Sequence, residues 1–335
     1  MTAAELDELV AALLSGRGFA HKSDIADVMD ALSVTEALIP HTDASVAIGD
    51  DCAAIPDGDG WLLLAIEGFV EDFVNQMPWL AGYSGVVVNV SDIAAMGGRP
   101  IAVVDALWSR GMTPAREVLQ GLTEASLRYG VPVVGGHTNH RSDRGQLAVA
   151  ILGRARKLLS SFDAVPGDAL IMAVDLRGKF EGDQPYWNAS TDAPAERLRA
   201  DLDLLAQIAE SDLSKAAKDI SMAGVVGTAL MLAECSRVGI EVDIDAIPRP
   251  QGVSLLRWLQ AFPSYGFLLS VAPANIAAVV DTFSTRGLAA AVIGNVNAGS
   301  ELTLASVDAS STVWDWKQRK FISGRQPSAG HADAV

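Results

Sequence analysis

The sequence predicts a two-domain α/β (α+β) fold in which mixed sheets are flanked by helices. Its 335 residues exceed one ordinary core and fit two domains of about 100–200 residues each. Hydrophobic residues make up 50% of the chain and charged residues 20%, so packed cores are expected and disorder is excluded as the main state. Strand-like and helix-like apolar segments also alternate along most of the chain.

The first half begins with helices and continues as alternating strands and helices. Leucines at helical spacing predict a helix at 3–15, and a second helix is expected at 23–32 with Ser23 or Asp24 as its cap. The other predicted elements are strands at 45–48, 61–66, 101–107, 131–134 and 146–153, and helices at 83–95 and 114–129. We therefore expect an N-terminal helical segment at 1–40 and a first domain at 41–158.

The second half repeats this mixed pattern after a Pro-Gly-Asp turn at 166–168. Residues 177–192 are rich in Gly, Asp and Asn and have no apolar period, which indicates a long surface loop. The predicted elements are strands at 169–174, 240–244, 266–271 and 289–296, and helices at 194–208, 224–239, 253–261 and 276–286. The second domain is expected at 159–310, followed by a tail at 311–335 whose last ten residues are expected to be disordered.

Charge and cysteine content exclude several classes of partner. The net charge is -16 and the pI about 4.6, which disfavours a nucleic acid or an anionic membrane surface. Mg²⁺ can still bridge acidic side chains to the phosphates of ATP. Cys52 and Cys235 form neither a disulfide framework nor a zinc pair, and no basic leader or apolar run of about 20 residues is present. We expect a cytoplasmic protein without membrane or nucleic-acid partners.

Two acidic segments carry candidate metal chemistry. Asp50 and Asp51 follow a short strand and a glycine, where they could offer oxygen ligands to Mg²⁺; a turn with solvated aspartates is the alternative. Asn89 and Asp92 are three residues apart on an apolar helix and therefore share a face. A carboxylate there needs a partner or a metal, although a polar stripe before a glycine C-cap is the plainer interpretation.

Two glycine segments are candidates for ligand binding. Gly135 and Gly136 follow an apolar strand and allow close backbone approach, with His137 beside them; a turn with a hydrogen-bonded histidine is the alternative. Residues 218–228 lead into a helix with Ser221 as a candidate cap, and such an end offers N–H groups to phosphate. The alternative is an ordinary helix start. Walker A, G-x-G-x-x-G, H-E-x-x-H and G-x-S-x-G patterns are absent from the sequence.

Taken in order, these four segments resemble the AIR-synthase-like superfamily. Its members include aminoimidazole ribonucleotide synthetase, thiamine-monophosphate kinase, selenophosphate synthetase and a hydrogenase-maturation protein. The resemblance covers residues 45–300 approximately, and its most specific part is NVSDIAAMGGRPIAVVDAL at 89–107. The other matching runs are IGDDCAAI at 48–55, GGHT at 135–138 and DISMAGVVG at 219–227.

The resemblance implies a two-domain AIR-synthase-like fold, a homodimer formed through the N-terminal domains, and a cleft for Mg²⁺ and ATP. The implied magnesium ligands are Asp50, Asp51, Glu67, Asp92 and Asp219. The implied nucleotide-binding residues are Asn89, Ser91, Gly135, Gly136, His137, Thr138, Ser221 and Gly224. Asp92, Asp219 and Lys22 are the implied catalytic residues, and a solvated surface lysine is the alternative for Lys22.

Departures from the resembled members limit which activity transfers. Met222 and His137 stand where thiamine-monophosphate kinase has aspartates, no cysteine precedes Cys52 as in selenophosphate synthetase, and the chain ends at Val335 rather than at a cysteine. We therefore expect a Mg-ATP-dependent phosphotransferase or activating synthetase acting on an unidentified small molecule. The alternatives are thiamine-monophosphate kinase, a non-catalytic nucleotide-binding scaffold or maturation partner, and a structural relative without a nucleotide site.

Overall fold

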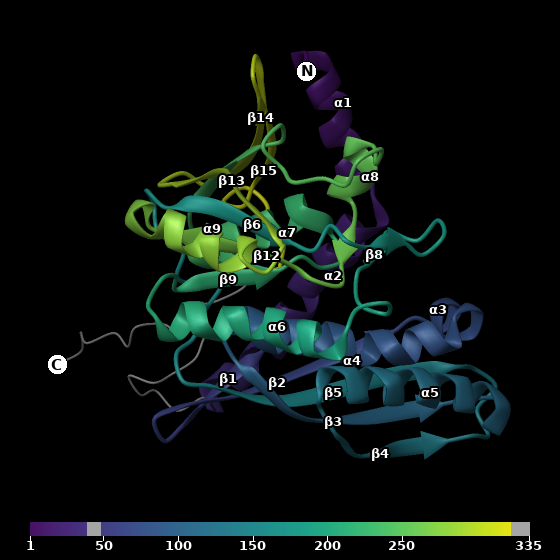
Figure 1. Cartoon of the computed structure of the whole chain (residues 1–335). Coiled ribbons are helices and arrows are strands. Elements are labelled where there is room, and N and C mark those ends of the chain that lie inside the picture. The colour runs from purple at the N-terminus through teal and green to yellow at the C-terminus, as the bar shows by residue number, and fades with distance from the viewer. Residues whose placement is uncertain (39–47, 323–335) are drawn as a thin grey trace.

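A computed structural model describes residues 1–38 and 48–322 and contains two large mixed sheets with helices against them (Figure 1). The first sheet has the order β1-β2-β5-β3-β4, in which only β3 and β4 are parallel. Its strands are β1 (Ala53–Asp57), β2 (Gly60–Phe69), β3 (Arg99–Trp108), β4 (Val133–Asn139) and β5 (Gln146–Ala155). The α/β class expected from the alternating pattern is confirmed.

One face of this sheet is covered by helices and the other is open. Along β2, Leu63 and Ala65 are buried, whereas the alternate residues Leu64 and Ile66 are exposed, as the two-residue period of a strand requires. The covering helices are α3 (Glu71–Gln76), α4 (Pro78–Ala95) and α5 (Met112–Tyr129). The sheet therefore presents its own apolar side chains outward on the uncovered face.

Helix α4 lies at the centre of the molecule and is buried on nearly every side. Glycines let it approach α5 closely: a Cβ on Gly121 would lie 1.8 Å from the Trp79 carbonyl oxygen, and one on Gly82 would lie 1.9 Å from that of Val118. Helix α6 (Ala195–Glu210) runs along the other side of α4 (Figure 1). Polar side chains on α4 are thus enclosed between the first sheet and the second domain.

The second sheet has seven strands in the order β15-β14-β10-β13-β6-β12-β9. Its strands are β6 (Ala169–Val174), β9 (Ala216–Asp219), β10 (Gly239–Asp243), β12 (Gly266–Val271), β13 (Ala289–Asn297), β14 (Glu301–Ser306) and β15 (Ala309–Asp315). The remaining helices of this half are α7 (Gly224–Ser236), α8 (Leu255–Leu259), η2 (Pro273–Asn275) and α9 (Ile276–Ser284).

Two cores hold the sheets together. One runs from the first sheet through α4 and α6 to residues such as Ile171 and Phe267 on one face of the second sheet. The other fills the opposite face, where α7 contacts helix α2 (Arg17–Leu32) and helix α1 (Ala3–Leu14) packs on β15 and α8. Helix α2 is followed by η1 (Ser33–Leu38). Because the first core is continuous across both halves, the junction between them is a packed one.

The structure corrects three local predictions. Helix α2 begins at Arg17 rather than at 23, and its N-cap is Gly16, so Ser23 and Asp24 lie inside the helix. The segment predicted as a surface loop at 177–192 contains β7 (Lys179–Phe180) and β8 (Tyr186–Asn188), which form a small sheet with β11 (Phe262–Pro263). Strand β15 includes residues 311–315, which had been assigned to the tail, because Val313 is buried against the sheet.

Some expectations fall outside the described residues. The strand predicted at 45–48 lies almost wholly in the part of the chain that is not described, as does the disorder expected at 326–335. Among residues 1–38 and 48–322, helices long and apolar enough to cross a membrane are not found. The other predicted elements agree with the structure to within a few residues at their ends.

Candidate functional site: an acidic junction between the domains

Acidic side chains from four separate segments influence one another where the two domains meet. We call the set Asp51, Glu67, Asp92 and Asp219 the acidic junction. Glu67 lies on the helix-covered face of β2 opposite Val149, Asp92 on the last turns of α4, and Asp219 at the end of β9. Asp51 lies just before β1. Long-range packing of the two domains, rather than local sequence, brings these groups together.

Asp92 is the most strongly perturbed member. Asp92 is 6% exposed, and its Oδ2 has no hydrogen-bond partner among residues 1–38 and 48–322. Burial raises its pKa well above the usual range, and the charges of Asp219, Glu67 and Asp51 raise it further, while Lys22 on α2 acts in the opposite direction. A buried carboxylate oxygen without a partner is costly, so this position favours a cation.

Asp219 and Glu67 share the same electrostatic environment. Burial, followed by the charge of Asp51, raises the pKa of Asp219 to about 7, although Lys218 and Lys22 lower it. The pKa of Glu67 is also raised by burial, and again Lys22 opposes the shift. The charge of Lys22 therefore lowers the pKa values of three of the carboxylates, Glu67, Asp92 and Asp219.

Asp51 is already paired with a buried lysine. The side chains of Lys218 and Asp51 are 5% and 6% exposed and form an ion pair, and Lys218 Nζ also lies 3.5 Å from Ser161 Oγ. Burial disfavours the charge on Lys218, but Asp51 and then Asp50 hold its pKa well above the usual value. The backbone N–H of Asp219 donates to Asp51 Oδ2 at 3.4 Å. Asp51 thus joins the start of β1 to the end of β9.

Asp50 is held by the segment that links the two domains. Its Oδ2 accepts hydrogen bonds from the Ser160 hydroxyl and the Ser161 backbone N–H, both at 2.9 Å, and its Oδ1 accepts one from the Ser161 hydroxyl at 2.5 Å. The backbone N–H of Asp51 also donates to Oδ1 at 2.9 Å. Both oxygens of Asp50 are therefore occupied within the protein.

The other residues of α4 that were predicted to bind nucleotide form hydrogen bonds within the protein. Asn89 Nδ2 donates to the carbonyl oxygens of Gly85 and Val149. Its Oδ1 is buried and finds no partner in the part of the chain that the structure describes. The Ser91 hydroxyl donates to the Val87 carbonyl at 3.0 Å.

Ser221 does not cap α7, whose N-cap is Ala223. The Ser221 hydroxyl is buried, and none of the described residues forms a hydrogen bond with it. Gly224 has φ +66°, and a Cβ there would lie 1.9 Å from the Leu259 carbonyl oxygen, so glycine is required by the turn and by packing against α8.

The predicted glycine segment lies apart from the acidic junction within one chain. Gly135, Gly136, His137 and Thr138 are exposed residues of β4, the outermost strand beyond β3. Three strand spacings separate β4 from β2, which carries Glu67, a distance of about 14 Å. His137 packs its ring against Trp108, with 5.8 Å between centroids. The single chain therefore does not assemble all the predicted nucleotide-binding residues into one site.

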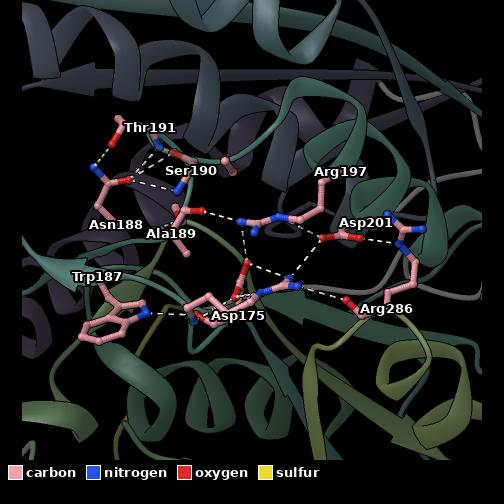
Figure 2. A network of polar contacts seen from close by, with 12 residues as sticks. Asp175, Trp187, Asn188, Ala189, Ser190, Thr191, Arg197, Asp201 and Arg286 are labelled. Carbon is pink, nitrogen blue, oxygen red and sulfur yellow. Dashed lines mark hydrogen bonds and ion pairs between the residues drawn. The ribbon is translucent and has the colours of Figure 1, made fainter.

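A second polar cluster forms hydrogen bonds with the segment at 177–192 (Figure 2). Asp175 and Asp201 are almost fully buried and are shared by three arginines, with Arg177 Nε 2.7 Å and Arg197 Nη2 3.2 Å from Asp175 oxygens. Arg286 forms an ion pair with Asp201. Trp187 Nε1 donates to the Asp175 carbonyl at 2.9 Å. This cluster joins β6, α6 and the end of α9, and explains why residues 186–190 are buried rather than looped out.

A groove of about 700 Å³ lies at the other end of α4. It is formed by both domains, and its lining residues include Trp79, Arg116, Thr123, Arg128, Thr191 and Asp192. Trp79 stacks on the buried Tyr83 with 5.1 Å between ring centroids. Trp79 and Asp92 are thirteen residues apart on α4, or about 20 Å, so this groove is separate from the acidic junction.

Sequence reasoning missed Lys218 and the serines Ser160 and Ser161. A signal for Lys218 was present, because a lysine in the apolar run Ala216-Ala217-Lys218-Asp219-Ile220 requires a buried counter-charge. The two serines gave no signal, since their role depends on how the interdomain segment passes Asp50. Among the described residues, three His, Cys, Asp or Glu side chains that could by themselves hold a metal ion are not found together.

Both halves of the chain match models of known protein families. Residues 49–155 match the AIR synthase related protein N-terminal domain, and residues 170–306 match the AIR synthase related protein C-terminal domain. The chain belongs to the AIR synthase related protein family. It is 48% identical over 314 residues to an uncharacterised protein of Synechocystis sp., covering 93% of this chain and 97% of that one. A second uncharacterised protein, from Methanocaldococcus jannaschii, is 36% identical over 323 residues, covering 95% and 99%.

Other similar proteins have names that state an activity or a ligand. The thiamine-monophosphate kinase of Pyrococcus horikoshii is 31% identical over 214 residues, which is 60% of this chain and 68% of that protein. Among solved structures, T. maritima PurL complexed with ATP matches with a TM-score of 0.66 at 17% identity, covering 78% and 45%. AaThiL complexed with AMPPCP and TMP matches with a TM-score of 0.63 at 19% identity, covering 87% and 98%. These likenesses confirm the two-domain AIR-synthase-like fold.

Proposed function

We propose that this family member is a Mg-ATP-dependent phosphotransferase or activating synthetase acting on a small molecule. The observation that carries the proposal is the buried, unpartnered Oδ2 of Asp92 within a group of carboxylates faced by Lys22. Burial and mutual repulsion raise the pKa values of Glu67, Asp92 and Asp219, and a divalent cation among them would remove that cost. Structural relatives that were solved with ATP or AMPPCP also support a nucleotide-dependent function.

The donor set fits magnesium. Mg²⁺ prefers oxygen ligands and is usually held by one or two carboxylates together with water and substrate phosphates, so a complete cage of protein ligands is not needed. Glu67, Asp92 and Asp219 would hold it, and when bound it would neutralise phosphate charge. Lys22 would contribute a further positive charge toward the phosphates, since phosphoryl transfer depends mainly on positioning and charge neutralisation.

We further propose that a second copy of the chain covers the open face of the first sheet. This face exposes apolar side chains that a monomer would leave in water: Ile55, Leu64, Ile66, Ile101, Val104 and Leu152 are 36–69% exposed. Large exposed apolar patches of this kind mark interaction sites.

Thiamine-monophosphate kinase is a second candidate, because a relative with that name is 31% identical over 60% of this chain. The difference at Met222, which is 44% exposed beside the junction, argues for another substrate. ADP release with thiamine monophosphate, measured against a panel of small phosphate acceptors, decides between them. ATP binding without ADP release for any member of the panel would favour a scaffold or maturation partner instead.

The proposed cytoplasmic location rests on Cys52 and Cys235, which are both buried free thiols.

A thermal-shift titration with ATP, with and without Mg²⁺, tests the proposal. Ligand at about 100 times its Kd adds roughly 2.7 kcal/mol, which raises Tm by several degrees in wild type. The same titration on Asp92→Asn should show no magnesium-dependent shift. If the variant responds like wild type, Asp92 does not hold the cation and the assignment of the acidic junction is wrong.

A further inference from the structure

The groove of about 700 Å³ beside Trp79 follows one face of helix α5. Its α5 lining comes from residues 116, 119–120, 123–124 and 128, and this three- and four-residue spacing places the side chains on one side of a helix. Trp79 of α4 and residues 191–192 of the second domain complete the lining. These residues are distinct from the acidic junction, so a ligand in the groove would occupy a site of its own.

Most of the charges that line the groove are already paired within the protein. Arg128 Nε lies 2.7 Å from Glu124 Oε1, and Asp192 Oδ2 lies 3.0 Å from Lys179 Nζ. Arg116 is an exposed residue, and the described part of the chain provides no ion-pair partner for it. The groove therefore carries one uncompensated guanidinium in a chain of net charge -16. A guanidinium of this kind favours a phosphate or carboxylate as its partner.

Trp79 provides an aromatic surface in the same groove. The residue is 36% exposed, and its ring stacks on that of Tyr83 with 5.1 Å between centroids and 20° between the ring planes. Tyr83 is fully buried, so it supports the indole from beneath. The exposed part of Trp79 is thus a pre-positioned surface on which a planar ring of a ligand can stack.

The separation of Trp79 and Arg116 limits the size of the ligand. A Cβ on Gly121 would lie 1.8 Å from the Trp79 carbonyl oxygen, so Trp79 is level with Gly121 along α5. Arg116 precedes Gly121 by five residues, which is about 7.5 Å along the helix axis. Gln120, an exposed lining residue between them, offers an amide to a polar linker. A ring on Trp79 and an anion on Arg116 would therefore be joined by a linker about as long as a pentose.

We propose that this groove is a second ligand site, which takes a nucleoside monophosphate with its base on Trp79 and its phosphate on Arg116. A planar base, a pentose and a single phosphate match the aromatic surface, the spacing and the one unpaired arginine. The site lies about 20 Å along α4 from Asp92, and it does not depend on whether the acidic junction holds a metal ion.

Isothermal titration of the full-length protein with AMP tests the proposal, with adenosine and inorganic phosphate as the two halves of the ligand. All titrations contain EDTA, so that magnesium-dependent binding elsewhere does not contribute. AMP should bind wild type about tenfold or more tighter than either half, because only AMP makes both contacts at once.

Two variants separate the two contacts. Arg116→Ala should weaken AMP binding by about tenfold or more while leaving adenosine binding within about twofold of wild type, because only AMP carries the phosphate. Trp79→Ala should weaken the binding of both AMP and adenosine by about fivefold or more, because both stack a base. Arg249→Ala, which removes an exposed arginine of the second domain, is the matched control and should bind AMP as wild type does.

The proposal is overturned if AMP fails to bind wild type at millimolar concentrations, or if Arg116→Ala and Arg249→Ala bind AMP equally well. Phosphate alone binding as tightly as AMP would also overturn it, because the base would then make no contact. Arg116 is exposed, so its replacement should leave circular dichroism unchanged and remains decisive even if Trp79→Ala does not fold. Failure of Mg-ATP to bind the acidic junction would overturn the proposed function while leaving this result unaffected.

Discussion

Neutralising Asp219 should make the metal-free protein more stable, because its charge is held at a cost in the folded state. The folded-state pKa of Asp219 is about 7, whereas an aspartate in an unfolded chain titrates near 3.9. The group thus binds its proton more tightly when folded, and ionisation opposes folding. The cost is absent below about pH 4, grows as the pH rises toward 7, and is constant above that.

The size of the effect follows from this difference. About three pKa units at 1.36 kcal/mol each set an upper value of about 4 kcal/mol at pH 8. Asp219→Asn should therefore raise the free energy of unfolding by about 1–4 kcal/mol at pH 8 in EDTA, and by almost nothing at pH 4. The increase should disappear when wild type is saturated with Mg²⁺ and nucleotide, since those ligands stabilise wild type alone.

Guanidinium denaturation at pH 4, 6 and 8, followed by circular dichroism, measures this difference. Asp201→Asn is the comparison variant, because the Asp201 carboxylate is buried but is shared by Arg177, Arg197 and Arg286. At pH 8 the two substitutions should change the free energy of unfolding in opposite directions: Asp219→Asn should raise it and Asp201→Asn should lower it. The reasoning is refuted if Asp219→Asn destabilises the metal-free protein at pH 8 as Asp201→Asn does, or if its effect does not depend on pH.

Three further changes test other parts of the structure. Asp201→Asn should cost about 3–5 kcal/mol in urea denaturation, because it leaves arginines without their buried partner; a cost below about 1 kcal/mol would contradict this. Ile66→Asp, on the open sheet face, should convert the proposed dimer to a folded monomer, as measured by chromatography with light scattering. Val307→Asp, 87% exposed on the β14–β15 turn, should leave the dimer intact. Equal molar masses for the two variants would rule out the open face as the dimer interface. Gly121→Ala should lower Tm, because overpacking between α4 and α5 should cost about 1–3 kcal/mol of stability. Gly68→Ala, with open space around the residue, should leave Tm nearly unchanged. Similar Tm values for the two variants would show that the helices can move apart.

Sequence patterns predicted most of the elements because each is long and has a clear period. The apolar runs of β6 and β12 are buried along their whole length, and the alternation in β2 follows from one covered and one open face. The failure at 177–192 has a physical cause, which is tertiary burial of polar sequence. Residues 186–190 look like a loop, yet they are buried because Trp187 donates to the Asp175 carbonyl within an arginine cluster formed by distant segments.

The candidate site was predictable in part. The carboxylate of Asp92 on an apolar helix gave a signal in the sequence, and Asp219 was implied by the family resemblance. The charge of Asp219 raises the pKa of Asp92 in the structure. The difference between Asp50 and Asp51 could not be predicted from neighbouring residues. It depends on which partners arrive from elsewhere: Ser160 and Ser161 from the interdomain segment, and Lys218 from β9.

The central claim is that Asp92 helps the acidic junction hold a magnesium ion for a nucleotide. Calorimetric titration of wild type and Asp92→Asn with AMPPCP, each with Mg²⁺ and with EDTA, tests it most directly. We predict saturable binding to wild type that requires Mg²⁺, and a loss of at least tenfold in affinity in Asp92→Asn while its circular dichroism is unchanged. Equal magnesium-dependent affinity in the two proteins, or binding to wild type that is the same in EDTA, would contradict the account.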